Sequence, residues 1–221
     1  MRAVRLWIKK EGRAKYISHL DMNRCFTRAV RRAKLAVWYT EGYNPHPYLN
    51  FLTPLSLGQE SDGEPLDIRI EDDTSNEEIT RRLNDVLPEG ISVVRTQDAV
   101  HKAADIAFAS YTITFETDDA DQAQAFCAAA DEALRQGALT AEKTGKQGRH
   151  KVVRQVNVCE KVRAFDFAAR DNFVTLHAVL RAGSDMLNPV LLTDALQSKL
   201  GTDHFVRIRR NVFLQADGSE F

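Results

Sequence analysis

The sequence has little of what many catalytic and secreted proteins depend on. Its three cysteines, Cys25, Cys127 and Cys159, are odd in number and far apart, and none lies in a CxxC pair. They predict neither a disulfide framework nor a zinc site, and free thiols in a reducing cytosol are expected. The chain also lacks the P-loop, GxSxG and HExxH motifs and a GxGxxG turn after a strand. The common nucleotide-binding, serine-hydrolase and metalloprotease sites are therefore not expected.

Long hydrophobic runs and a surplus of one charge are lacking as well. No window approaches the roughly 18 apolar residues of a membrane span, and the opening MRAVRLWIKKEGRAKY has no signal-like apolar segment. The 30 basic and 31 acidic residues give a net charge of -1. A nucleic-acid surface would therefore have to come from local segregation of charge. We expect a cytoplasmic protein with no membrane contact.

What is present is the composition of a globular protein, with 43% hydrophobic and 28% charged residues. In the first half, Ser18 followed by Asp21 indicates a helix start, and apolar residues then recur at helical spacing. Asp73-Thr74-Ser75 starts a second helix, which the Pro88-Glu89-Gly90 break ends. Strands are predicted around these helices, at residues 3–9, 35–39, 48–52, 66–70 and 91–96.

After a linker at 98–108, a similar order of elements follows. Strands are predicted at 111–115, 152–158, 173–180 and 204–214. A helix is predicted at 120–134, and Asn188-Pro189 begins another that ends at Gly201. We therefore predict an α+β protein of two ferredoxin-like (split βαβ) domains in tandem, residues 1–103 and 104–221. A single larger α+β domain is the alternative.

The first predicted helix has a basic outer face. On a helical wheel Met22, Phe26, Ala29 and Ala33 share one side, and the arginines Arg24, Arg28, Arg31 and Arg32 lie roughly opposite. A solvated face with local ion pairs such as Asp21 with Arg24 is one interpretation. Recognition of phosphate or carboxylate is the other, since the guanidinium fork matches those oxygens.

Two histidines are candidate site residues. His46 lies in TEGYNPHPYLNF, where Gly42, Asn44 and the prolines Pro45 and Pro47 predict a stiff loop. Such a loop suits ligand binding or proton transfer, and equally a plain connector. His19 lies at the edge of the apolar side of the helix, where a packed structural role and a site role are both open.

Charge is segregated along the chain. Residues 60–78 hold nine acids and one base, whereas residues 142–163 hold seven bases and two acids. The basic stretch includes GKQGRHK, a predicted hairpin of the kind that contacts an RNA backbone. A solvated charged hairpin is the alternative. The candidate RNA contacts are Lys146, Arg149, Lys151, Arg154, Arg207 and Arg209.

Residues 15–68 resemble the N-terminal signature of bacterial radical-SAM-associated proteins. The resemblance lies in HLD, the arginine-spaced helix, GYNPHP and PLSLG-x-ES-x-GE-x-LDI, in that order. Weaker similarity includes RAGSDMLNP and VRIRRNVFL. Members of that family are encoded beside, or fused to, a radical SAM protein, often near ribosomal-protein and ribonuclease genes. The motif residues carried over are His19, Asp21, Arg24, Arg28, Arg31, Arg32, Gly42, Asn44, Pro45, His46, Ser61, Glu64 and Asp67.

The resemblance implies a partner subunit that binds RNA or a ribosome-related substrate for a radical SAM enzyme. S-adenosylmethionine and the iron-sulfur cluster are expected on that partner, because this chain has no CxxxCxxC motif. No cofactor or metal is expected in this chain. We favour a non-catalytic role. The alternative is metal-independent RNA processing by His46 and His19, which requires both imidazoles to share one cleft. A third hypothesis is an assembly factor that makes no nucleic-acid contact. It predicts that carboxylates from residues 60–78 neutralise the arginines.

Overall fold

A computed structural model describes the backbone of residues 1–147 and 150–221 and the side chains of residues 1–142 and 155–221. The α-helices in this part of the chain are α1 (His19–Arg32), α2 (Asn76–Asn84), α3 (Ala120–Arg135) and α4 (Pro189–Leu200). Short 3-10 helices lie at η1 (Gly12–Tyr16), η2 (Ala103–Asp105), η3 (Cys159–Lys161) and η4 (Gly183–Asp185). The strands are β1 (Arg2–Lys10), β2 (Leu49–Phe51), β3 (Glu60–Ile70), β4 (Ile91–Asp98), β5 (Phe108–Glu116), β6 (Thr140–Gln147), β7 (His150–Asn157), β8 (Val162–Arg170), β9 (Phe173–Arg181) and β10 (Phe205–Leu214).

The chain forms two compact units. The first comprises Met1–Asp105 with Arg209–Val212, and the second comprises Ile106–Ile208 with Phe213–Phe221. Strand β10 therefore contributes residues to both. Helices alternate with antiparallel strands, and β10 adds a short parallel pairing to β3 at Arg209 and Arg210. The predicted α+β class is confirmed, with mixed strand pairing.

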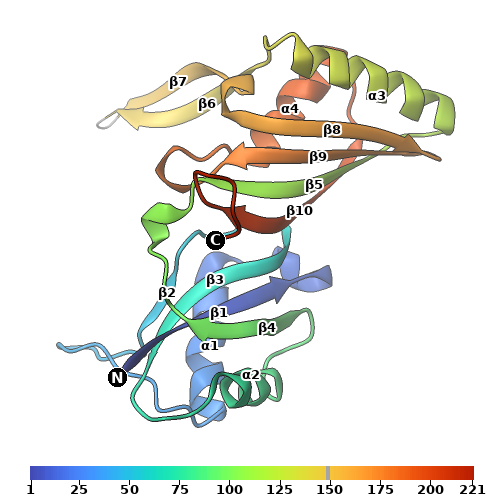
Figure 1. The fold of residues 1–221 in the computed structure, drawn as a ribbon. Coiled ribbons are helices and arrows are strands. Elements are labelled where there is room, and N and C mark those ends of the chain that lie inside the picture. Colours follow the sequence, from blue (N-terminus) through green and yellow to red (C-terminus); the bar gives the residue numbers. More distant parts are fainter. Residues whose placement is uncertain (148–149) are drawn as a thin grey trace. The chain divides into compact units, whose positions relative to one another are not determined.

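The first unit has the strand order β4-β1-β3, with β2 on the side of β3 away from β1 (Figure 1). All of these pairings are antiparallel. Helix α1 thus connects β1 to β2 across β3, and α2 connects β3 to β4 across β1. Both helices pack against the same face of the sheet, because their buried residues join one cluster with the strands. Phe26 of α1, Leu83 of α2 and Leu66 of β3 are among its fully buried members.

The second unit repeats this order with one insertion. Its sheet runs β10-β5-β9-β8, and β6 and β7 form a separate two-stranded sheet between α3 and β8. Strands β5, β9 and β8 pair antiparallel. Helix α3 packs on β8 and β9 and also contacts α4. Figure 1 shows the β6-β7 hairpin as an arm separate from this sheet.

Helix ends follow the capping residues of the sequence. Asn188 accepts a hydrogen bond from the Val190 N–H at 3.2 Å, Pro189 is the first helical residue of α4, and Gly201 ends it in the left-handed conformation. Residues 35–39, predicted as a strand, form only isolated bridges, at Val37 and Tyr39. The structure also has strands where none was predicted, namely β8, residues 140–144 of β6 and residues 60–65 of β3.

No helix in the described part of the chain is long and apolar enough to span a membrane.

Candidate functional site: an arginine groove on helix α1

Helix α1 begins at a complete cap. The Ser18 hydroxyl accepts from the Asp21 N–H at 3.1 Å and donates to the Asp21 carboxylate at 2.7 Å. These hydrogen bonds, with a contribution from Arg24, hold the pKa of Asp21 below its ordinary value. The cap therefore accounts for Asp21 at this position.

The predicted faces of α1 are confirmed. Met22, Phe26 and Ala29 are buried against the sheet, whereas the four arginines are exposed. Three of them, Arg24, Arg28 and Arg32, follow at four-residue intervals and so form a stripe along one side of the helix. This stripe forms one wall of a groove of about 410 Å³, which we call the arginine groove. Its lining residues are Asp21, Arg24, Cys25, Arg28, Arg32, Val86 and Pro88.

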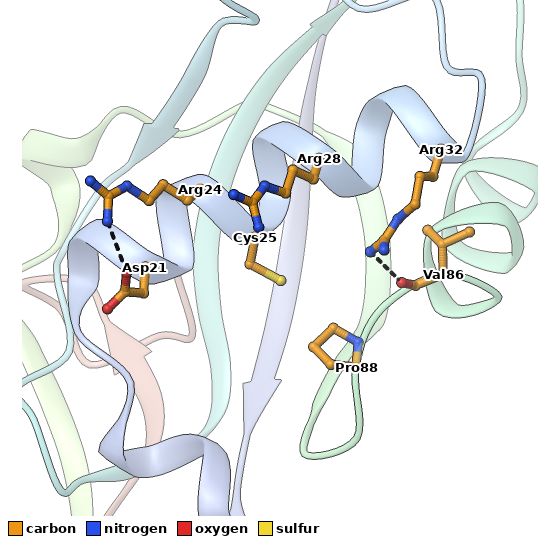
Figure 2. A pocket seen from close by; sticks show the side chains of 7 residues that line it. All are labelled: Asp21, Arg24, Cys25, Arg28, Arg32, Val86 and Pro88. Carbon is orange, nitrogen blue, oxygen red and sulfur yellow. Dashed lines mark hydrogen bonds and ion pairs between the residues drawn. The ribbon is translucent and has the colours of Figure 1, made fainter.

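The α2-β4 loop forms the opposite side of the groove. Figure 2 shows Val86 and Pro88 of this loop facing α1, with the Cys25 side chain beside Arg28 and the Arg32 guanidinium beside Val86. Arg32 donates to the Val86 carbonyl at 2.8 Å, which ties the end of α1 to the loop. Each four-residue step along an α-helix advances about 6 Å, so the arginines present donors in a row.

Most of the positive charge in the groove is not neutralised. Its one carboxylate, Asp21, lies 3.3 Å from Arg24 at one end, and both side chains are more than half exposed. Within the described residues the Arg28 side chain has no hydrogen bond or ion pair, and the Arg32 side chain reaches only a carbonyl. The groove thus holds three guanidinium groups and a single exposed carboxylate, which makes it chemically suited to bind anions.

Arg31 lies apart from the groove. Its Nε donates to the Tyr39 hydroxyl at 3.1 Å, and its guanidinium carbon lies 5.8 Å from the Tyr39 ring centroid. The basic face predicted from the helical wheel is thus divided. Three arginines line the arginine groove and the fourth holds the start of the GYNPHP loop.

That loop is closed by paired contacts between Thr40 and His46. Thr40 N–H donates to the His46 carbonyl at 2.9 Å, and His46 N–H donates to the Thr40 hydroxyl at 3.3 Å. The imidazole Nδ1 lies 3.1 Å from both the Thr40 hydroxyl and the Asn44 carbonyl. Gly42, at a φ of 123°, adopts a conformation that side chains disfavour. His46 is exposed on this turn, with Gly42, Asn44 and Pro45.

The two candidate catalytic imidazoles have different neighbours. His19 packs edge-on against Phe51, with ring centroids 5.1 Å apart, whereas His46 contacts Thr40 and Asn44. Within the described residues no hydrogen bond or ring contact joins them. The shared cleft that RNA processing would need stays a prediction.

The three candidate residues on β3 have partners inside the first unit. Glu64 forms a buried ion pair with Arg210, and Asp67 accepts from Arg5 at 2.7 and 3.0 Å. The Ser61 hydroxyl accepts from the Gly63 N–H at 3.2 Å, and Ser61 is fully buried. These side chains are held in place by the fold, and none of them lines the arginine groove.

The acidic segment neutralises other arginines than those of α1. Glu60 and Asp62 pair with Arg209, and Glu78 pairs with Arg81 and Arg82. The pKa of Glu78 is lowered to about 2 by hydrogen bonds from these two arginines. In the described part of the chain, no ion pair connects residues 60–78 to α1, so the pairing expected for an assembly factor is not seen.

The candidate RNA contacts of the second half are only partly described. Arg149 lies outside the described residues, and of Lys146, Lys151 and Arg154 only the backbone is described. Lys146 and Lys151 are Cα partners in the β6-β7 ladder, as are Lys143 and Arg154. Two further candidates have carboxylate partners: Arg207 donates to Glu116 at 2.7 Å, and Arg209 donates to Asp62 at 2.8 Å.

One group of interacting side chains, around β3, was not predicted from the sequence. The Arg69 guanidinium carbon is 4.5 Å from the Tyr48 ring centroid and 4.9 Å from that of Trp38. These residues come from three separate segments, and only strand alternation at Arg69 could have indicated that it lies outside the core. No group of three or more metal-ligating side chains occurs among the residues whose positions are described.

Comparisons with known proteins identify a family. Residues 3–189 match the model of the DUF2344 family, described as "Uncharacterized protein conserved in bacteria". No curated protein matches the chain. Among solved structures, a chain of a Cbf5-Nop10-Gar1 complex is similar at a TM-score of 0.48 and 9% identity, over 94% of this chain and 49% of that chain. This protein thus spans about half the length of that chain.

A second solved structure, an unknown protein from Galdieria sulphuraria, is similar at a TM-score of 0.25 and 9% identity. The similarity covers 95% of this chain and 98% of that one. Likeness at this level does not establish a shared function.

Proposed function

The chain belongs to the DUF2344 family of proteins conserved in bacteria, and we propose that it is an accessory protein that binds the phosphate backbone of RNA through the arginine groove. The observation that carries the proposal is the stripe of Arg24, Arg28 and Arg32 with a single, exposed carboxylate at one end. Arginine is suited to this role because its planar fork binds phosphate oxygens bidentately.

The geometry favours an extended anion over a single small one. The guanidinium groups follow one another along two turns of α1, about 12 Å of helix. The groove is open and exposed rather than enclosed, as its exposed arginines show. A polyanion that follows the helix can contact several guanidinium groups at once and release counterions at each.

Binding of labelled RNA by fluorescence anisotropy tests this proposal. Arg28→Glu is the informative variant, because the Arg28 side chain makes no hydrogen bond or ion pair within the described residues and so can be changed with little effect on the fold. We expect a loss of affinity of about tenfold or more, and a salt dependence shallower by roughly 0.7 per lost phosphate contact on single strands.

The matched control is Arg170→Glu, which makes the same change of charge at a side chain that is 93% exposed. Arg170 ends β8 in the second unit and does not line the arginine groove. If Arg170→Glu weakens binding as much as Arg28→Glu, net charge alone governs binding, and the groove is not the site.

The partner is proposed from the resemblance in residues 15–68. We place the protein in the bacterial cytoplasm beside a radical SAM enzyme, which would carry S-adenosylmethionine and the iron-sulfur cluster, while this chain holds the RNA or ribosome-related substrate. Copurification of the tagged chain with a radical SAM protein from its own host tests this. Arg28→Glu should retain the partner while losing RNA, which separates the two activities.

The fold class proposed for both units is ferredoxin-like. The strand orders β4-β1-β3-β2 and β10-β5-β9-β8, each with two interleaved crossover helices, support it. In the second unit the β6-β7 hairpin would be an insertion into that plan.

A further inference from the structure

Trp38, Tyr48 and Arg69 form a stack on the first unit, away from the arginine groove. The Arg69 guanidinium lies over both aromatic rings, at 4.9 and 4.5 Å from their centroids. The two rings are 5.9 Å apart and inclined at 55°, so they do not stack face to face on each other. We call these three residues the aromatic-arginine stack.

Backbone hydrogen bonds fix the stack in place. Trp38 N–H donates to the Arg69 carbonyl at 2.9 Å, and Tyr48 N–H donates to the Trp38 carbonyl at 2.9 Å. The side chain of Arg69 alternates with the buried Ile68 and Ile70 along β3. It therefore lies on the sheet face opposite the one that packs against α1 and α2.

Arg69 differs in its partners from Arg135 and Arg207, two other arginines that contact aromatic rings. Arg135 lies over Phe165 and pairs with Asp131 at 2.6 Å, and Arg207 lies over Phe173 and pairs with Glu116 at 2.7 Å. The Arg69 side chain, in contrast, makes no hydrogen bond or ion pair with any other described residue. The three side chains of the aromatic-arginine stack are half-buried. Among the described side chains, the two aromatic rings are therefore what positions the Arg69 guanidinium.

We propose that the aromatic-arginine stack binds an unpaired base of single-stranded RNA. A nucleobase stacks on aromatic rings and on guanidinium planes, and this requires a base that is not already stacked within a duplex. Asn50 is an exposed amide on the same sheet face, because its Cα partner is Asp67, two residues from Arg69. It can supply hydrogen bonds to a base edge.

This inference rests on the proposed RNA binding and specifies its substrate as single-stranded. Tryptophan fluorescence gives a direct signal. The chain has two tryptophans, and Trp7 is 3% exposed whereas Trp38 is half-buried within the stack. A stacked base should therefore quench Trp38, and the quenching should disappear in Trp38→Phe.

The experiment titrates the full chain with a single-stranded RNA 12-mer, the same sequence as a duplex, and inorganic polyphosphate. We expect quenching by the single strand alone. Arg69→Lys keeps the charge and removes the guanidinium plane, and should weaken single-strand binding about fivefold or more, within the range of one stacked base. Duplex and polyphosphate binding should not change.

Tyr48→Phe keeps the ring and is the matched control, with affinity expected to stay within about twofold because stacking needs only the ring. Circular dichroism confirms that each variant is folded. Equal quenching by duplex or polyphosphate, or single-strand affinity unaltered in Arg69→Lys, would overturn the inference. If Arg28→Glu still removes RNA binding in that case, the proposed function stands alone. If Arg69→Lys weakens binding and Arg28→Glu does not, the stack is a site and the arginine groove is not.

Discussion

Replacing Glu64 with alanine should destabilise the first unit by about 3–5 kcal/mol, the cost of breaking a buried ion pair. The Glu64 and Arg210 side chains are 5% and 4% exposed. Arg210 donates from Nε at 2.8 Å and from Nη2 to the same carboxylate. Lys10, at 2% exposed, is a second buried cation near Glu64. The substitution therefore removes a negative charge that interacts with two buried positive charges, which places the cost in the upper part of that range.

Urea unfolding followed by tryptophan fluorescence measures this, because both tryptophans, Trp7 and Trp38, belong to the first unit. Glu11→Ala is the control, since Glu11 and Lys9 of its ion pair are 43% and 32% exposed, and an exposed pair contributes little to stability. The double variant Glu64→Leu with Arg210→Met should recover most of the loss, since an apolar pair needs no compensating charge. A cost for Glu64→Ala no larger than that for Glu11→Ala would refute the reasoning.

Three further predictions concern titration and helix ends. Burial lowers the pKa of Lys10 below its ordinary value of 10.5, and the charge of Glu64 opposes this shift whereas that of Arg210 reinforces it. At pH values between the folded pKa and 10.5 the unfolded chain binds the extra proton, so the free energy of unfolding rises with pH in that window. Lys10→Met should flatten this rise, and urea midpoints of the variant and the original protein that change with pH in the same way would contradict it. Burial raises the pKa of the Cys25 thiol, and the charges of Arg32 and Arg28 oppose this rise. Arg28→Gln should therefore leave less thiolate at neutral pH and slow the alkylation of Cys25, and an equal or faster rate would contradict an effect of Arg28 on this thiol. Asn188→Ala should cost about 1 kcal/mol by removing the cap of α4, visible as a lower melting temperature by circular dichroism, and an unchanged melt would show that the cap contributes nothing.

Local signals predicted the elements whose formation is local. Ser18 and Asn188 marked helix starts because an N-cap acts on residues two or three positions away. The helical wheel separated buried Met22 and Phe26 from the exposed arginines because the helical period fixes the faces. Strand β8 was missed because only Phe165 and Phe167 alternate with polar or small residues there, and its exposed positions leave a weak pattern.

The partners of site residues could not be predicted in the same way. Glu64 was grouped with the arginines of α1, but its partner Arg210 lies 146 positions later in the chain. The aromatic-arginine stack was missed because Trp38, Tyr48 and Arg69 meet only after three segments pair. Such contacts depend on the register between strands, which hydrophobic spacing does not specify for polar side chains.

Protection of Cys25 from alkylation tests the central claim most directly. Cys25 is half-buried and lines the arginine groove, whereas Cys127 lies on α3 and does not line it. RNA bound along Arg24, Arg28 and Arg32 should slow the reaction of Cys25 with a maleimide several-fold, and leave Cys127 unaffected. The protection should saturate at the RNA concentration that saturates anisotropy. An unchanged Cys25 rate at that concentration would contradict binding in the arginine groove.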